Sequence, residues 1–432
     1  MKLRFFMPDS QDLVDPSFDF RRETRSRERV RQRDDVYAHE LFSSVPYDGI
    51  LVSKAIVDGI GGSGAGRYTL GQRTRFMRCG VRAFLRAEDL PIPIMGDCGA
   101  FSYIGERTPP YSVEDVASFY EVAGFDAGVS LDHVILPYRP EWDDSRVDDE
   151  GKDARERQEL TLQYASEFRK LHKRQKLSFM PLGVAQGWSP RSYRRSLSAL
   201  QKMGYRYIAV GGLVPYRDHQ ILATLEAMNE VRRGDTRLHL LGVTRTHHVE
   251  AFTNFGAASF DSTSPLRQAF KDDKDNYYLP GGNALPAVRV PQLDGNPKLQ
   301  RRIRSGEVDQ SLARTLEGSA LELLRKYAAR RVKLDELVPV LCDYERLLDP
   351  TRQNEDVYRE VLGARPWEKC PCDVCRTIGY QVILFRGAER NKRRGFHNTW
   401  VFRQRLNEAL DQLEPPKIRG ARKGRAQLDA TP

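Results

Sequence analysis

Three cysteines and one histidine near the end of this 432-residue chain have the types and spacing of metal ligands. Cys370, Cys372 and Cys375 fall within six residues, and His397 follows a basic stretch. Three thiolates and one imidazole are ligands that a tetrahedral Zn²⁺ accepts. The alternative is a chance group of reduced thiols, but half of the chain's six cysteines lie here. We expect one structural Zn²⁺ per chain, because four protein ligands leave no open position for a zinc hydrolase.

A second set of polar residues stands at the ends of short apolar runs. Asp97, Asp132, Gln186 and Asp261 each end or follow such a run. A single aspartate in that place is most often a turn former, but three at matching strand ends indicate a shared site. Paired carboxylates suit chemistry at an anomeric carbon, where one attacks as the nucleophile and another moves protons. Gly211 and Gly212 would let backbone groups approach a ligand closely.

The elements that position these residues alternate between strands and helices. Helices are expected at 68–87, 113–123, 155–173, 190–203 (with Ser189 as its N-cap), 219–232 and 248–255. The eight expected strands are 2–8, 49–57, 91–97, 127–135, 179–186, 207–213, 239–243 and 258–262. Eight strands separated by helices predict an α/β fold, a closed (β/α)8 TIM barrel, whose active site lies at the carboxyl ends of the strands. A doubly wound open sheet gives a similar alternation and stays as the alternative.

The chain divides into four expected parts. Residues 1–280 would form the barrel, which includes a charged helix or loop at 21–35, and residues 281–360 a mainly helical insertion. Residues 361–416 would form a zinc subdomain with a closing helix at 396–413, and the basic residues 417–432 a disordered tail.

Composition limits the class of protein and its surroundings. The net charge of +10 weakly favours a polyanionic partner. No apolar run is long enough to span a membrane, and the first eight residues are too short and charged for a secretory signal. The clustered thiols without a disulfide framework suit a reducing compartment. We therefore expect a cytoplasmic protein.

Several short motifs, taken in order together with the metal ligands, resemble those of the queuine/archaeosine-type tRNA-guanine transglycosylases, which are zinc-containing (β/α)8 enzymes. Each motif alone is weak, and the order of the set carries the resemblance from the third strand to the last helix. The matching segments are Gly96-Asp97-Cys98-Gly99-Ala100-Phe101, Gly183-Val184-Ala185-Gln186-Gly187, Gly211-Gly212-Leu213, Leu241-Gly242-Val243 and Ser259-Phe260-Asp261-Ser262.

The resemblance implies a specific mechanism. Asp261 would attack C1′ of a guanosine nucleotide and displace guanine, and a 7-deazaguanine base would then attack C1′. Asp97 would act as the general acid/base. The substrate-binding residues implied are Asp132, Gln186, Gly211, Gly212 and Leu241.

Departures from the tRNA enzymes point to one branch of the family. Ala100, Ser102 and Tyr103 replace a Gly-Gln run. Trp188 replaces a glycine, and the long helical insertion follows Asp261. These features look like the DNA-acting branch, which places 7-cyano-7-deazaguanine (preQ0) into double-stranded DNA. Action on tRNA is the alternative, and a catalytically inactive zinc-containing nucleic-acid-binding protein is a more distant one. The resemblance also allows a partner ATPase and a homodimer.

A basic run beside the metal ligands suggests how DNA would be held. A guanine in a duplex must be flipped out, and phosphate contacts would offset the lost stacking. The alternative is a solvated basic face. The residues expected to contact nucleic acid are Arg386, Arg390, Lys392, Arg393 and Arg394.

Overall fold

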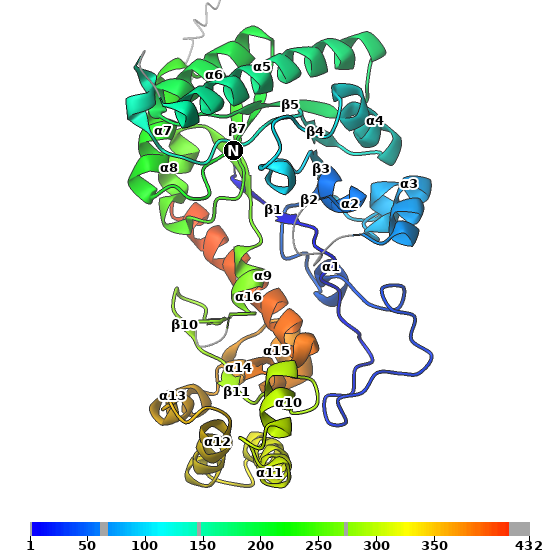
Figure 1. Ribbon diagram of the computed structural model, residues 1–432, viewed down its shortest axis with the longest axis vertical. Helices are drawn as coiled ribbons and strands as arrows, with labels where there is room; N and C mark the ends of the chain where they lie inside the picture. The colour runs from blue at the N-terminus through cyan, green and yellow to red at the C-terminus, as the bar shows by residue number, and fades with distance from the viewer. Residues whose placement is uncertain (1, 61–67, 145–147, 272–274, 414–432) are drawn as a thin grey trace, which may run out of the picture.

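Eight parallel strands close into a barrel in the computed structural model, which describes residues 2–60, 68–144, 148–271 and 275–413 (Figure 1). β1 pairs with both β2 and β8, which decides between the closed barrel and the open sheet. The strands are β1 Arg4–Pro8, β2 Gly49–Ser53, β3 Ile94–Asp97, β4 Ala127–Val129, β5 Met180–Ala185, β6 Tyr207–Val210, β7 Arg237–Leu240 and β8 Ala257–Asp261. The predicted TIM barrel is confirmed.

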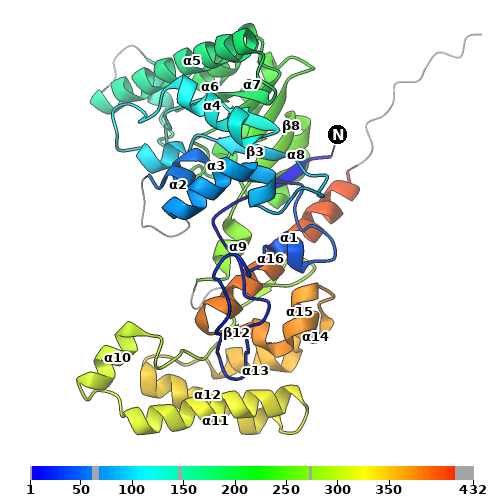
Figure 2. The same cartoon turned by 90° about the vertical axis from the view of Figure 1, so that its right-hand side faces the viewer.

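Helices cover the outside of the barrel (Figures 1 and 2). Ser189 caps α6 as predicted, since its hydroxyl oxygen accepts the Ser192 N–H at 3.0 Å. In β3 and β4, Gly96 and Gly128 make room for the Tyr120 ring, because a Cβ at either position would lie 2.3 Å from it. The helices are α1 Ala38–Leu41, α2 Lys54–Asp58, α3 Leu70–Phe84, α4 Val113–Ala123, α5 Asp149–Gln175, α6 Pro190–Lys202, α7 Asp218–Val231, α8 Val249–Asn254 and α9 Ser264–Gln268.

A mostly helical region follows the barrel and lies at the far end of the molecule (Figure 1). Its helices are α10 Pro297–Arg304, α11 Gln310–Ala328, α12 Leu334–Leu348, α13 Glu355–Ala364, α14 Pro366–Lys369, α15 Asp373–Ile378 and α16 Gly387–Asp411. Its short strands are β9 Tyr277–Tyr278, β10 Ala284–Leu285, β11 Val288–Arg289 and β12 Leu384–Phe385.

Several expected elements have other bounds in the structure. β2 ends at Ser53 and α2 begins at Lys54, and β4 ends at Val129, so Asp132 lies in the loop after β4. The charged run 21–35, expected as a helix or a loop, forms turns and irregular backbone. α16 begins at Gly387, nine residues before the expected start at 396, so the basic run after Arg386 lies inside this helix. The expected disordered tail falls outside the described residues.

Candidate functional site

One cavity of about 380 Å³ opens at the carboxyl ends of the barrel strands. Its size lies in the usual range for small-molecule sites. β3 and β8 each end in a carboxylate, and the segments after β4 to β7 add Asp132, Gln186 and three glycines to the lining. All seven predicted catalytic and substrate-binding residues line it: Asp97, Asp132, Gln186, Gly211, Gly212, Leu241 and Asp261.

Asp132 is held by both of its carboxylate oxygens. The Cys98 thiol donates to Oδ1 at 2.9 Å, and the Gln186 side-chain amide donates to Oδ2 at 2.7 Å. The Tyr103 hydroxyl donates in turn to the Cys98 sulfur at 3.1 Å. Burial and the nearby charge of Asp132 raise the pKa of the Cys98 thiol, so it remains a donor. A carboxylate has about four lone-pair sites, so Asp132 can still accept N–H groups from a planar base.

Asp97 holds a proton at neutral pH. Burial, followed by the charges of Asp132 and Asp261, raises the pKa of Asp97 to about 8. Like charges in one small cavity resist simultaneous ionisation, which is the usual way in which neighbouring carboxylates acquire different roles. Asp97 is therefore suited to donate a proton first and accept one later.

Asp261 is nearly buried at 7% exposure, and one of its oxygens is already occupied. Oδ1 accepts the Gly242 N–H at 3.1 Å and lies 3.1 Å from Nε2 of His239. Oδ2 has no hydrogen bond in the described part of the chain, and the residue borders the cavity. This carboxylate is therefore oriented with one oxygen free to react.

The two predicted glycines are required by close packing. A Cβ on Gly211 would lie 2.3 Å from the Gln186 amide nitrogen, and one on Gly212 would lie 2.3 Å from the Ile135 carbonyl oxygen. Gly212 also has a φ of +79°, which side-chain-bearing residues rarely adopt. Glycine at both positions keeps the wall of the cavity close to Gln186.

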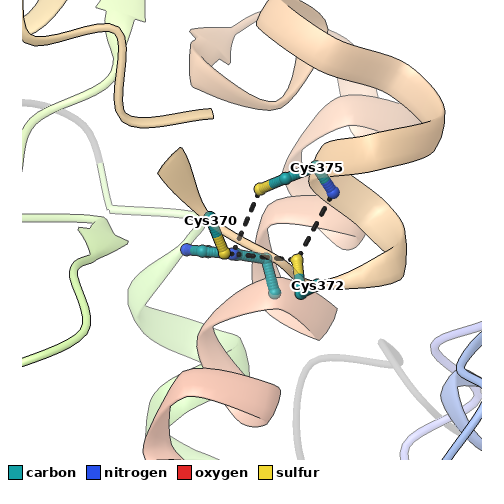
Figure 3. A group of neighbouring side chains, drawn as sticks. Cys370, Cys372 and Cys375 are labelled. Carbon is teal, nitrogen blue, oxygen red and sulfur yellow. Dashed lines mark hydrogen bonds between the residues drawn. The ribbon is translucent and has the colours of Figure 1, made fainter. Parts of the chain in front are cut away.

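The four predicted metal ligands come together at the start of α15 and within α16. Figure 3 shows Cys370, Cys372 and Cys375 pointing toward one another, and the four ligand atoms lie within 4.8 Å of each other. The sulfur atoms are 3.6, 3.4 and 3.4 Å from Nδ1 of His397. A tetrahedral ion the size of Zn²⁺ requires S···N separations of about 3.5 Å, so this group fits such an ion.

His397 is fixed by its second nitrogen. Nε2 donates to the Tyr278 carbonyl at 2.8 Å, which leaves Nδ1 unprotonated and facing the thiols. The Tyr277 ring stacks on the imidazole at 4.1 Å, and its hydroxyl lies 3.3 Å from the Cys375 sulfur. The four ligands are thus buried, and two contacts orient the imidazole toward the thiols.

A second group with metal-ligating atoms was not predicted from the sequence. His247 and His248 lie 2.7 and 3.1 Å from one oxygen of Asp218. The other oxygen accepts Arg245 at 2.7 Å, so the carboxylate charge is already balanced and we assign no metal there.

The expected nucleic-acid contacts of the basic run require correction. Arg386, Arg390, Arg393 and Arg394 are 5%, 2%, 3% and 0% exposed, and Lys392 donates to the Leu13 carbonyl at 2.9 Å. Arg394 donates to the carbonyls of Val382, Leu384 and Ala269. Guanidinium groups buried in this way cannot reach the phosphates of a bound polymer, so the four arginines are structural.

Three of these arginines anchor a long N-terminal loop. Residues 15–35 form this loop, which Val14 and Val36 close by a strand-like bridge. Glu23 accepts Arg386 and Arg390, both at 2.6 Å, and Arg393 pairs with Glu389 at 2.6 Å. Glu389 also accepts the backbone N–H of Asp15 at 3.1 Å, so α16 fixes both the start and the middle of the loop.

Sequence reasoning missed two side chains that hold the carboxylates. Cys98 stands next to Asp97 in one of the matching segments, but its residue type gives no sign that it binds Asp132. The sequence predicts His239 only as the first residue of a strand, although its position two residues before Leu241 places it on the same face as that cavity residue. Strand alternation was the signal that could have identified it.

No helix in the described ranges is long and apolar enough to cross a membrane.

Two comparisons agree with this geometry. The family described as "Queuine tRNA-ribosyltransferase" matches residues 111–277, which include Asp132, Gln186 and Asp261. A protein of Salmonella montevideo described as "DNA-guanine transglycosylase" is 50% identical over 412 residues, which cover 95% of this chain and 98% of that protein. With its closed barrel, its carboxylate-lined cavity and this identity over nearly the whole length, the chain belongs to the guanine transglycosylase family of enzymes.

Proposed function

We propose that this protein replaces guanine in double-stranded DNA by a 7-deazaguanine base, with 7-cyano-7-deazaguanine as the incoming base. The observation that carries the proposal is the single cavity in which Asp97, Asp132 and Asp261 have three different environments. The printed name of the Salmonella montevideo relative supports DNA as the polymer. Action on tRNA is the alternative, because the chemistry at C1′ would be the same.

The first half of the reaction would form a covalent intermediate. Oδ2 of Asp261 attacks C1′ of the flipped nucleotide, so that the C1′–O bond forms as the C1′–N9 bond to guanine breaks. Asp97, which is protonated at neutral pH, gives its proton to the departing guanine. Asp132 accepts hydrogen bonds from the edge of the base, and Gln186 forms hydrogen bonds with the same edge.

The second half would reverse these roles. The N9 atom of the incoming base attacks C1′ and loses its proton to the Asp97 carboxylate. The C1′–O bond to Asp261 breaks, and both carboxylates return to their starting states. No further co-reactant is required, because one glycosidic bond is exchanged for another.

We infer that the metal is Zn²⁺ and that its role is structural. Cys370, Cys372, Cys375 and His397 would hold it with four protein ligands, which leave no position for substrate. When bound, it would fix α15 against α16. A homodimer and a partner ATPase stay predictions from the resemblance.

The test offers a labelled 7-deazaguanine base together with duplex DNA or with tRNA. We expect label in DNA nucleosides by mass spectrometry, and a protein–DNA adduct when the incoming base is withheld. Asp261→Ala should lose both signals. Asp235→Ala, which changes an exposed carboxylate at the opposite end of the barrel, should keep both.

Two outcomes would contradict the proposal. Label that enters tRNA and not DNA would transfer the function to the alternative polymer. An adduct that persists in Asp261→Ala would exclude this residue as the nucleophile.

A further inference from the structure

Four polar side chains form a continuous hydrogen-bonded chain through the interior of the barrel. Tyr207, His239, Ser259 and Asp261 are 5%, 0%, 0% and 7% exposed. Nε2 of His239 lies 3.1 Å from Asp261 Oδ1, and Nδ1 lies 2.5 Å from the Ser259 hydroxyl oxygen. That hydroxyl also bonds the Tyr207 hydroxyl. The chain connects the carboxylate at the mouth with the opposite end of the barrel, where Tyr207 and Arg4 line a separate cavity.

Strand register places these side chains on one face. His239 on β7 is paired with Ser259 on β8, and Asp261 follows Ser259 by two residues, so all three point inward. This pairing depends on a register shift between Leu238 and His239. Leu238 is paired with Ala257, so the next pair, His239 with Ser259, skips one residue of β8. β-Bulges next to active sites commonly redirect a side chain in this way.

The direction of the hydrogen bonds follows from the donors available. The charged Arg4 guanidinium acts on Tyr207 and has no acceptor atom, so the Tyr207 hydroxyl turns its own proton toward Ser259. Burial raises the pKa of Tyr207, which keeps that proton in place. Ser259 then donates its single proton to Nδ1 of His239. The remaining ring proton sits on Nε2 and faces the Asp261 carboxylate, which is the arrangement that satisfies all four groups.

We propose that His239 is a positioning residue for Asp261, held as the Nε2–H tautomer by Ser259 and Tyr207. This inference rests on the proposed role of Asp261 as nucleophile. The His239 and Gly242 N–H groups both bind Oδ1, so Oδ2 is the oxygen that bonds to C1′. When the C1′–Oδ2 bond breaks in the second half of the reaction, the same two donors stabilise the returning carboxylate charge.

Variants of His239 separate this role from simple packing. His239→Leu removes the donor, and kcat should fall by about 10- to 100-fold, as for loss of a hydrogen bond to a charged group, while KM for the incoming base stays unchanged. His239→Gln keeps a side-chain N–H within reach of Oδ1 and should recover much of that loss. In Ser259→Ala the ring is free to change tautomer, and the kcat of this variant should lie between those of the two His239 variants.

A matched control is available in another buried histidine. His39 is 6% exposed, with its ring nitrogens bonded to the Tyr47 hydroxyl at 2.6 Å and the Leu85 carbonyl at 2.9 Å. It does not border the cavity at the carboxyl ends of the strands. His39→Leu should lower the unfolding temperature without lowering kcat per folded molecule.

A second readout does not depend on activity. In the protein labelled with ¹⁵N-histidine and free of substrate, the ring nitrogen shifts of His239 should show a protonated Nε2 and an unprotonated Nδ1. His239→Gln assigns the signals by their loss. If the wild type exchanges no base into any polymer, the proposed function fails while this tautomer can still be observed.

Three results would overturn the inference. The first is an Nδ1–H tautomer in the wild type. The second is a kcat of His239→Leu equal to that of the wild type. The third is an equal loss of kcat in folded His239→Gln and His239→Leu. Each can occur while the wild type continues to exchange guanine, so none is confused with failure of the proposed function.

Discussion

Three aspartates share a cavity of about 380 Å³, and their surroundings suit them to different roles. Asp97 keeps its proton because burial and two carboxylate neighbours raise its pKa to about 8. Asp261 instead receives two N–H groups on one oxygen, which leave the other oxygen to react. Different environments for neighbouring carboxylates are how acid and nucleophile roles are divided at neutral pH.

The pH dependence of exchange should report the proton on Asp97. If this proton is needed by the departing guanine, kcat/KM for the polymer should fall as pH rises through about 8. Asp132→Asn removes a negative neighbour whose charge raises that pKa, so the alkaline limb should move to lower pH. A pH–rate profile of both proteins measures the shift. A limb that stays in place or moves upward would contradict the assignment.

At the scale of elements, the N-terminal loop and α16 form one charged unit. Burial alone would raise the pKa of Glu23, but the hydrogen bond and charge of Arg386 and the charge of Arg390 lower it to about 2. Phe20 in the same loop packs under the guanidinium groups of Arg390 and Arg393, at 5.3 and 5.0 Å. The loop therefore depends on α16 for its conformation.

Glu23→Gln should destabilise the protein by about 3–5 kcal/mol, because it leaves the buried Arg390 guanidinium without a carboxylate and Arg386 with Glu317 alone. The depressed pKa means that the stabilisation is complete above pH 4.5 and is lost as pH falls toward 2. Urea unfolding at pH 7 measures the change. Glu28→Gln, on an exposed position of the same loop, should change stability little. Equal effects of the two substitutions would show that the ion pairs contribute nothing.

Because Arg386, Arg390, Arg393 and Arg394 are buried, contacts with phosphates must come from more exposed cations. Arg21, Arg27 and Arg31 of the N-terminal loop are exposed, and in the described part of the chain none of them forms a salt bridge with a carboxylate. β1 borders the cavity at its last residue, Pro8, and the loop begins at residue 15. These three side chains are therefore the best-placed cations in the loop for a bound polymer.

Replacing Arg21, Arg27 and Arg31 by Gln should weaken DNA binding and reduce the slope of log K against log salt by about 0.9 for each phosphate that these side chains neutralise. Titrations over a range of salt concentrations measure the slope. The control replaces Lys173, Lys202 and Arg237, which are exposed at the opposite end of the barrel. An unchanged slope in the loop variant, or an equal change in the control, would exclude the loop as a phosphate-binding element.

The sequence predicted the barrel and the cavity because both depend on local periodicity. Strand ends carry Asp97 and Asp261, and parallel strands bring their carboxyl ends to one mouth. The environment of Arg386 was not predictable in this way, because its partner Glu23 lies 363 residues earlier in the chain. His239 was missed for a related reason, since its contact with Ser259 depends on a register shift between strands.

At the scale of the whole molecule, α16 connects the metal site with the barrel (Figure 2). Its first half carries His397, and its second half carries Phe402, whose ring lies 4.9 Å from Phe5 of β1 and 6.1 Å from Phe260 of β8. α16 therefore covers the outside of the strand pair where the barrel closes. The carboxyl end of this pair includes Asp261, so one helix joins the predicted metal ligands to the strands that hold the proposed nucleophile.

Removal of the metal should consequently affect the barrel as well as the helical region. Ion binding to such a four-ligand site contributes directly to the free energy of folding. A strong chelator should therefore lower the unfolding temperature, and base-exchange activity should be lost together with the ion. Hydrogen exchange should show reduced protection in α15 and α16, and then in β1 and β8 where Phe402 packs, while β4 and β5 on the far side keep theirs. Metal analysis before and after chelation provides the control. Full exchange activity in protein shown to be metal-free would mean that α16 holds the barrel closed without the ion.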